Sequence, residues 1–235
     1  MQELKTIAVI HTDFPEKFGI PRQAGLVPQL RAKIVFEPEY RNPDAVRGIE
    51  EYSHLWLLWG FSKAKQNGFV ATVAPPRLGG KERKGVFATR SPYRPNSIGL
   101  SSVELVSVEL DPKLGPVLVV AGADLLDGTP IYDVKPYLAY TDSHPDARGS
   151  FGEAHKDDRI EVDFPQELLE RLPQEQREAV FHVLAQDPRA AYNKKPDYVY
   201  GMAYGGYDIR FTVADGVLTV RDVIRTRQKD FAKVK

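Results

Sequence analysis

Short runs of apolar and β-branched residues follow one another over the first 140 residues, separated by glycine, proline and aspartate. We expect strands at 4–10, 33–36, 52–61, 100–110, 116–121 and 131–134, and a further strand that begins at 85–88. No helix of crossover length separates these runs, which argues against a doubly wound parallel sheet. The pattern predicts an antiparallel sheet closed into a barrel or packed as a sandwich. Few polar residues interrupt 52–61, so this strand is expected to be buried on both faces.

The second part of the chain changes character. Residues 141–158 are polar and predict a linker or loop, and a strand is expected at 160–164. Helical periodicity follows at 168–172 and 180–184, with Pro165 and Pro173 at the expected helix starts. A β meander is expected over 198–204, 207–213 and 217–223, turning at Gly205-Gly206 and Asp215-Gly216. The chain is therefore expected to be mainly β (α+β overall), with domains at 1–140 and 160–235 joined by a linker at 141–159.

Composition narrows the class of protein. The 42% hydrophobic and 27% charged content is that of an ordinary globular chain. Cysteine is absent, which excludes disulfides, thiolate metal sites and cysteine nucleophiles, and fits a cytoplasmic protein. The apolar run at 7–10 is too short for a signal peptide or a membrane span.

The net charge of zero conceals two basic tracts. Residues 77–94 carry six basic residues against one acidic residue, and residues 189–235 carry ten against five. Local patches of this kind, rather than the global charge, would have to engage a nucleic acid. Tyrosines are interleaved with the second tract, which suits stacking of single-stranded RNA bases, although the same tyrosines would also suit a packed strand face.

The segment 85–99 (GVFATRSPYRPNSIG) is the strongest candidate for chemistry. Arg90 and Arg94 offer planar forks of donors for carboxylates or phosphates, and nearby prolines stiffen the backbone that carries them. The alternative is a surface turn with salt-bridged arginines. A second loop, 19–26, presents Arg22 and Gln23 between proline and glycine.

A third candidate segment, 122–137, places three aspartates around a Gly-Thr-Pro turn. It predicts either a capped turn or the polar edge of a pocket. No dinucleotide fingerprint, P-loop or nucleophile elbow occurs, and the five histidines show no metal-ligand spacing. His54, on an apolar strand, is either a satisfied core group or part of a pocket wall.

Several separated blocks together resemble the TsaA-like (TrmO) family of tRNA methyltransferases. They include Pro21-Arg22-Gln23, Ser53-His54-Leu55, GVFATRS at 85–91 with Arg94-Pro95-Asn96, DLLDGTP at 124–130, and Asp187-Pro188-Arg189. The resemblance is strong over residues 4–140 and weaker over 180–225. This chain has Ser62 where members often have His, and Ser97 where they often have Pro.

The resemblance implies an antiparallel β-barrel catalytic domain and a homodimer. From the residues themselves, we expect no metal and no membrane partner. It also implies transfer of a methyl group from S-adenosylmethionine to N6 of N6-threonylcarbamoyladenosine, 3′ to the anticodon of threonine-type tRNA. The residues carried over as cofactor contacts are Pro21, Arg22, Gln23, His54, Ser62, Lys63, Arg90, Leu100, Asp124, Leu125, Leu126 and Asp127.

For catalysis, Asp127 is the candidate acceptor of the N6 proton and Asn96 is a second candidate. The residues expected to contact the tRNA anticodon loop are Arg77, Arg94, Arg189, Tyr192, Lys194 and Lys195. Two other readings stay open at this point: a methyltransferase with a different substrate, and a non-catalytic sensor of S-adenosylmethionine or RNA.

Overall fold

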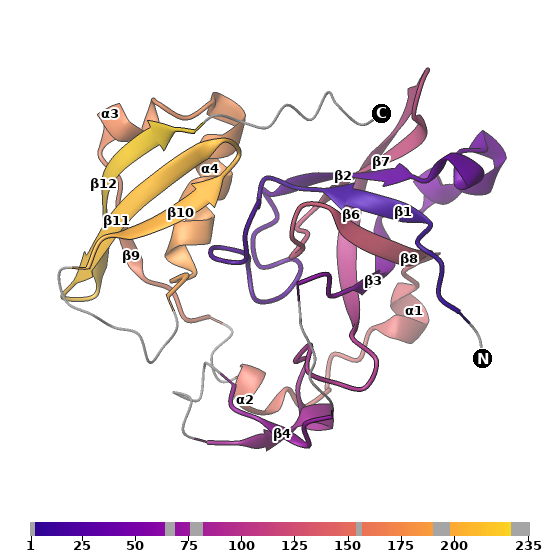
Figure 1. The fold of residues 1–235 in the computed structure, drawn as a ribbon, viewed down its shortest axis with the longest axis horizontal. Helices are drawn as coiled ribbons and strands as arrows, with labels where there is room; N and C mark the ends of the chain where they lie inside the picture. The colour runs from indigo at the N-terminus through magenta and orange to yellow at the C-terminus, as the bar shows by residue number, and fades with distance from the viewer. Residues whose placement is uncertain (1–2, 64–68, 76–81, 154–156, 190–197, 227–235) are drawn as a thin grey trace.

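The computed structural model describes residues 3–63, 69–75, 82–153, 157–189 and 198–226, which form two β structures side by side (Figure 1). The larger is a closed barrel with strand order β1-β2-β7-β6-β3-β8, and every neighbouring pair is antiparallel. Its strands are β1 Ala8–His11, β2 Arg31–Phe36, β3 His54–Gly60, β6 Ile98–Asp111, β7 Gly115–Ala121 and β8 Thr129–Pro136. The predicted antiparallel barrel is confirmed.

Along each barrel strand, alternate side chains point inward and fill the core of the barrel. In β3 the side chains of Leu55, Leu57 and Trp59 are buried, whereas those between them are partly exposed. The prediction that this strand is buried on both faces was wrong. The outward Trp56 finds a polar partner instead, since its indole N–H donates to Asp142 at 2.8 Å.

Two other strand predictions need correction. The strand expected at 4–10 begins only at Ala8. The strand expected to begin at 85–88 is limited to β5, Lys84–Gly85, which pairs with β4, Thr72–Val73. The next residues, Val86–Ala88, form a 3-10 turn closed by the Thr89 amide donating to the Val86 carbonyl. Further 3-10 turns lie between β2 and β3, at Pro38–Tyr40, Pro43–Val46 and Ile49–Glu51.

The antiparallel pairing decides where the connections lie. The β1–β2, β3–β6 and β7–β8 connections all leave the barrel at one end, which we call the three-loop mouth. The β2–β3 and β6–β7 connections lie at the opposite end. Candidate segments at 21–23, 90–96 and 124–127 therefore share one mouth although they are far apart in the sequence.

The smaller structure is a four-stranded sheet covered by helices, with the order β10-β11-β12-β9. Its elements are β9 Glu161–Asp163, β10 Tyr200–Tyr204, β11 Tyr207–Ala214, β12 Val217–Arg225, α3 Gln166–Leu169 and α4 Gln174–Ala185. The β meander and both helices agree with the sequence pattern. The parallel pairing of β9 with β12 was not predicted. Between the two structures, the expected linker also contains helical turns, α1 Ala139–Asp142 and α2 Ser150–Glu153.

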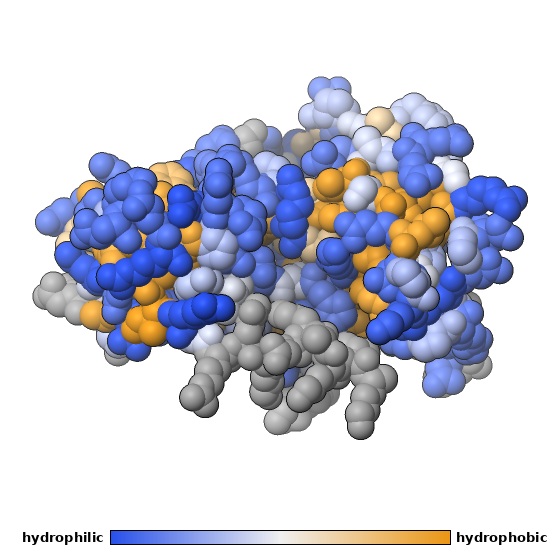
Figure 2. Space-filling view, turned by 90° about the horizontal axis from the view of Figure 1, so that it is seen from above, coloured by the Kyte–Doolittle hydropathy of each residue, from blue (hydrophilic) through white to orange (hydrophobic). Residues whose placement is uncertain are grey.

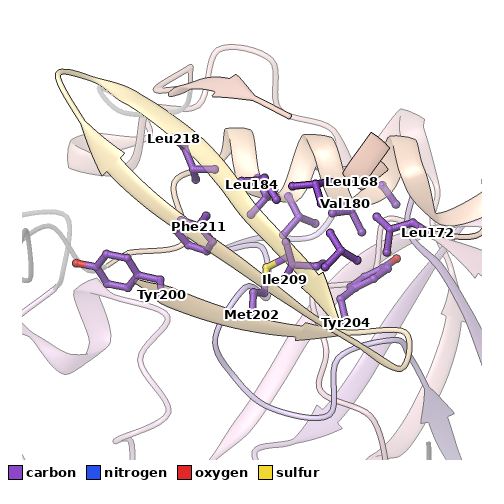
Figure 3. Packing of buried hydrophobic residues seen from close by; sticks show 14 of the residues in the cluster. Leu168, Leu172, Val180, Leu184, Tyr200, Met202, Tyr204, Ile209, Phe211 and Leu218 are labelled. Atoms are coloured by element: carbon purple, nitrogen blue, oxygen red, sulfur yellow. The ribbon is translucent and has the colours of Figure 1, made fainter. Parts of the chain in front are cut away.

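The core of the smaller structure includes side chains that arrive from the barrel. Figure 3 shows residues of β10, β11 and β12, such as Met202 and Ile209, packed against Val180 and Leu184 of α4. Phe14, Val27 and Leu30 of the β1–β2 loop are buried in the same cluster. Backbone bonds accompany this packing, because the Gly205 amide donates to the Asp13 carbonyl. The β1–β2 loop thus fastens the smaller sheet to the barrel.

Phe14 offers a test of this fastening. Its side chain is 1% exposed and meets the Tyr204 ring edge-on, with ring centroids 5.1 Å apart. We expect Phe14→Ala to lower the free energy of unfolding by about 3–5 kcal/mol, because a large aromatic side chain is removed from a packed core. Denaturant unfolding followed by circular dichroism measures this. Leu4→Ala, at an exposed position, is the control, and a loss no larger than the control's would contradict the assignment.

Candidate functional site

Three loops bring polar side chains together at the three-loop mouth. Arg90, from the β3–β6 connection, donates through Nη1 to Oε1 of Gln23 in the β1–β2 loop. The positive charge of Arg90 also acts on the carboxylate of Asp124, which follows β7. The mouth therefore holds an exposed guanidinium, an amide and a partly buried carboxylate next to one another.

Asp124 is held from inside the barrel. Ser101 of β6 is buried and lies 2.6 Å from Asp124, measured from Oγ to Oδ1. The indole nitrogen of Trp59 on β3 lies 3.0 Å from the same Ser101 oxygen. Burial raises the pKa of Asp124, while the Ser101 hydrogen bond, the charge of Arg90 and the Ala24 backbone act to lower it.

A polar chain continues from Gln23 to the smaller sheet. The Gln23 amide nitrogen donates to the carbonyl of Arg22, and the Arg22 guanidinium donates to the carbonyls of Asp187 and Arg189 at 3.5 Å each. The segment after α4 is therefore tied to the loop that carries Gln23. Pro21, beside this pair, is buried and stiffens the loop.

Arg189 was predicted to contact RNA, and the structure places it against Asp187 in the turn after α4. Its side chain is only 7% exposed, and two of its nitrogens donate to the two oxygens of Asp187 at 2.8 and 2.9 Å. A buried, bidentate guanidinium of this kind stabilises the turn after α4. A local charge pattern does not reveal this burial, and the RNA contact of Arg189 stays a prediction.

Asp127 lies at the junction of the barrel and the smaller sheet. Its Oδ1 accepts the Thr12 amide at 3.2 Å and lies 3.3 Å from His11 Nδ1. Its negative charge also acts on Asp13, which the Tyr204 hydroxyl contacts. Asp127 is only 28% exposed, and its Oδ1 lies in a polar corner of the mouth beside Thr12 and His11.

The carbonyls of Leu125 and Leu126 already have partners. Thr12 donates its hydroxyl to the Leu125 carbonyl at 3.1 Å, and Thr129 donates to the Leu126 carbonyl at 2.7 Å. Both leucine side chains are buried. This segment forms a rigid floor between Asp124 and Asp127.

A shallow cavity of about 330 Å³ adjoins the mouth on the outside of the barrel. Asn96, Ser62 and Tyr132 line it, together with Gly60, where a side chain would collide with the Tyr132 hydroxyl. Leu100 also points outward and is 52% exposed. Lys63 is exposed beside this cavity, and its carbonyl accepts from Lys17 at 3.4 Å.

Not every expected site residue reaches the mouth. His54 begins β3 and lies at the opposite end of the barrel, about 20 Å along the strand from Gly60, with Ser53 and Tyr137 as neighbours. Arg94 donates to the Thr89 carbonyl at 2.9 Å and lies over the Phe87 ring, so it braces its own loop. Four predicted RNA contacts lie outside the described residues: Arg77, Tyr192, Lys194 and Lys195.

Sequence reasoning missed Ser101, Trp59, Asp13 and Tyr204. The inward position of Ser101 in an alternating strand was the available signal, because a hydroxyl inside a barrel needs a partner.

Among the described residues, no three His, Asp or Glu side chains are grouped so that they could hold a metal ion. In the same part of the chain, no helix is long and apolar enough to cross a bilayer.

A β-barrel with a charged mouth and an attached small sheet has clear relatives. The family model for the tRNA-methyltransferase O N-terminal domain matches residues 9–143, and the TrmO C-terminal domain model matches residues 157–226. This chain belongs to the tRNA-methyltransferase O family.

Individual relatives agree over nearly the full length. The tRNA (adenine(37)-N6)-methyltransferase of Escherichia coli is 40% identical over 221 residues, which cover 91% of this chain and 94% of the relative. A putative S-adenosylmethionine-dependent methyltransferase of Pseudomonas aeruginosa is 39% identical, and the match covers 87% of this chain and 90% of the relative. A crystal structure of TrmO from P. aeruginosa superimposes with a TM-score of 0.78 and 34% identity, over 96% of this chain and 97% of that one.

The acidic corner beside Asp127 makes a prediction about pH. Burial, with the charges of Asp127 and Glu175, raises the pKa of Asp13 above its ordinary value of 3.8, although the Tyr204 hydroxyl acts to lower it. The folded chain thus keeps this proton to a higher pH than the unfolded chain does. The stabilising contribution of the protonated Asp13 carboxyl is therefore lost as the pH rises through the pKa that this group has in the folded chain.

Asp13→Asn removes this titration and should therefore gain stability relative to the parent chain between pH 4 and pH 7. Urea unfolding at each pH measures the difference. Asp111→Asn is the control: backbone N–H donors lower the pKa of the exposed Asp111, so its contribution is lost only as the pH falls below about 4, and between pH 4 and pH 7 its profile should run parallel to that of the parent chain. Parallel pH profiles for Asp13→Asn and the parent chain would contradict the assignment.

Proposed function

We propose that this chain transfers the methyl group of S-adenosylmethionine to N6 of adenosine 37 in tRNA, and that its substrate there is N6-threonylcarbamoyladenosine. The observation that carries the proposal is the meeting of Gln23, Arg90 and Asp124 at one mouth of a barrel that matches the family over its full length. The threonylcarbamoyl group follows from the motif resemblance. It makes the N6–H more acidic than in plain adenosine, so a weak base suffices.

The side chains at the mouth suit a methyl donor with both charges and hydrogen-bonding groups. Arg90 would bind a carboxylate, Asp124 would accept from an N–H group, and Gln23 would orient Arg90. When bound, S-adenosylmethionine would supply an electrophilic methyl carbon on a sulfonium. N6 would attack that carbon in line, so that the N6–carbon bond forms as the carbon–sulfur bond breaks, S-adenosylhomocysteine leaves and the N6 proton is given up. The task of the protein is then mainly to align the reacting groups.

Asp127 is our candidate to take the N6 proton. The Thr12 amide and His11 fix the orientation of its carboxylate, which matters because a general base must lie within hydrogen-bond reach of its proton. Asn96 lines the cavity beside the mouth and is the second candidate, acting by positioning the substrate rather than by moving a proton.

We also propose a homodimer that acts on tRNA in the cytoplasm, with residues 160–235 as the tRNA-contacting part. Figure 2 shows apolar surface gathered over the barrel half of the molecule. Among the described residues, β6 carries four exposed large apolar side chains, those of Ile98, Leu100, Val106 and Leu110. An exposed apolar strand face supports burial against a second copy. Light scattering after size-exclusion chromatography gives the mass that tests it.

The activity itself is tested with two tRNA substrates. The protein is incubated with S-adenosylmethionine and one of two tRNAs. One tRNA carries N6-threonylcarbamoyladenosine next to the anticodon, and the other carries plain adenosine at the same position. Mass spectrometry of the nucleosides should show one added methyl group only on the modified adenosine. Methylation of plain adenosine would overturn the substrate, and binding without any methylation would favour a sensor.

Arg90→Ala tests the cofactor site. We expect the Kd for S-adenosylmethionine to rise about 10- to 100-fold, which corresponds to the loss of a charged hydrogen bond. Isothermal titration calorimetry measures this value. Arg83→Ala is the matched control, because Arg83 is engaged with Thr72 in the β4–β5 hairpin. An unchanged Kd for Arg90→Ala would remove Arg90 from the site.

Lys194→Ala combined with Lys195→Ala tests the basic tract. We expect the KM for tRNA to rise several-fold and to depend less steeply on salt, because phosphate contacts release counterions. The Kd for S-adenosylmethionine should stay the same. Lys113→Ala, in the β6–β7 connection at the far end of the barrel, serves as the control. Equal tRNA kinetics in both variants would show that the tract does not contact tRNA.

A further inference from the structure

We propose that Ser101 and Trp59 are positioning residues, which hold Asp124 as an ionised hydrogen-bond acceptor facing the three-loop mouth. Neither residue belongs to the motifs from which the site was expected, and neither is placed to touch the reacting atoms. The inference rests on the proposed function in one respect: the N–H donor that Asp124 accepts belongs to the bound methyl donor.

The direction of each hydrogen bond follows from the chemistry of the groups. An indole nitrogen can only donate, so the Trp59 N–H, 3.0 Å from the Ser101 oxygen, must donate to it. A serine hydroxyl has one proton, and its other neighbour is Oδ1 of Asp124 at 2.6 Å. The Ser101 proton is therefore directed at Asp124. A carboxylate that receives this short bond is favoured in its charged form.

Packing leaves this arrangement little freedom. Ser101 is 3% exposed, and Trp59 is buried in the barrel core. Gly99, the partner of Trp59 on β6, has no side chain, and a Cβ there would lie 2.2 Å from the Trp59 ring. The glycine thus makes room for the indole that orients Ser101.

The environment of Asp124 explains why it needs such support. Burial acts to keep the carboxyl protonated, and Arg90 is the charged side chain of the described residues that opposes this. The remaining help comes from Ser101 on β6 and from the backbone amides of Ala24 and of Asp124 itself. A carboxylate accepts about four hydrogen bonds, so these three leave one position for a ligand N–H.

The first experiment follows ligand binding. S-adenosylhomocysteine, which cannot be turned over, is titrated by calorimetry into the full chain between pH 4 and pH 8.5. For Ser101→Ala we expect the Kd at pH 7 to be about tenfold higher than in the parent chain. As the pH is lowered, binding to the variant should begin to weaken about one pH unit above the pH at which binding to the parent chain weakens. The sign follows because loss of the donor raises the pKa of Asp124, and binding that needs the carboxylate is lost as the pH falls.

Matched variants separate positioning from simple structural damage. Ser101→Thr keeps the hydroxyl and should restore the parent pH profile. Trp59→Phe should weaken binding in the same direction by a smaller factor, and Asp124→Asn should bind weakly with no pH dependence in this range. Ser102→Ala, on the outer face of the same strand, should leave the profile unchanged. A loss for Ser101→Ala that is equal at every pH would overturn the proposal.

The second experiment does not need the ligand. Carbon-13 NMR of the Asp124 carboxyl in the ligand-free chain should show a higher pKa in Ser101→Ala than in the parent chain. An unchanged pKa overturns the positioning role. If the pKa rises but the parent chain does not bind S-adenosylhomocysteine, the proposed function fails and the Ser101 inference stands, so the two failures are distinguishable.

Discussion

The pairing of β8 with both β1 and β3 closes the barrel, and the location of the site follows from that closure. Because every neighbour is antiparallel, alternate connections must emerge at the same end. The loops that hold Gln23, Arg90 and Asp124 are separated by more than thirty residues at each step, yet they meet at one mouth. The same constraint sends His54 to the other end of β3, away from the charged cluster.

The β1–β2 loop contributes both to the core of the smaller sheet and to the mouth of the barrel. Its apolar side chains Phe14, Val27 and Leu30 belong to the core of the smaller sheet, while Gln23 contacts Arg90 at the barrel mouth. Arg22 adds polar contacts to the carbonyls of Asp187 and Arg189. A change in how the smaller sheet packs would therefore reach Gln23 directly, which gives a physical route between the two parts of the molecule.

Local pattern predicted most strands, both helices and the meander, because alternation and turn residues act over a few neighbours. It failed where a long-range partner decides the outcome. The run 52–61 is apolar throughout, but barrel closure places Trp56 outside, where Asp142 satisfies its indole. The parallel pairing of β9 with β12 likewise joins segments more than fifty residues apart. Arg189, by contrast, pairs with its near neighbour Asp187, and here it is the burial of the side chain that the local pattern does not show.

The sequence by itself determined the strand pattern, the absence of thiol chemistry and the motifs that identify the family, since each is a property of residue types and their local order. Only the tertiary structure decided which of those motifs meet. Burial and hydrogen-bond direction depend on atoms from distant strands, and so the support of Asp124 by Ser101 and Trp59, inside the barrel, became visible only once β3, β6 and the end of β7 lay side by side.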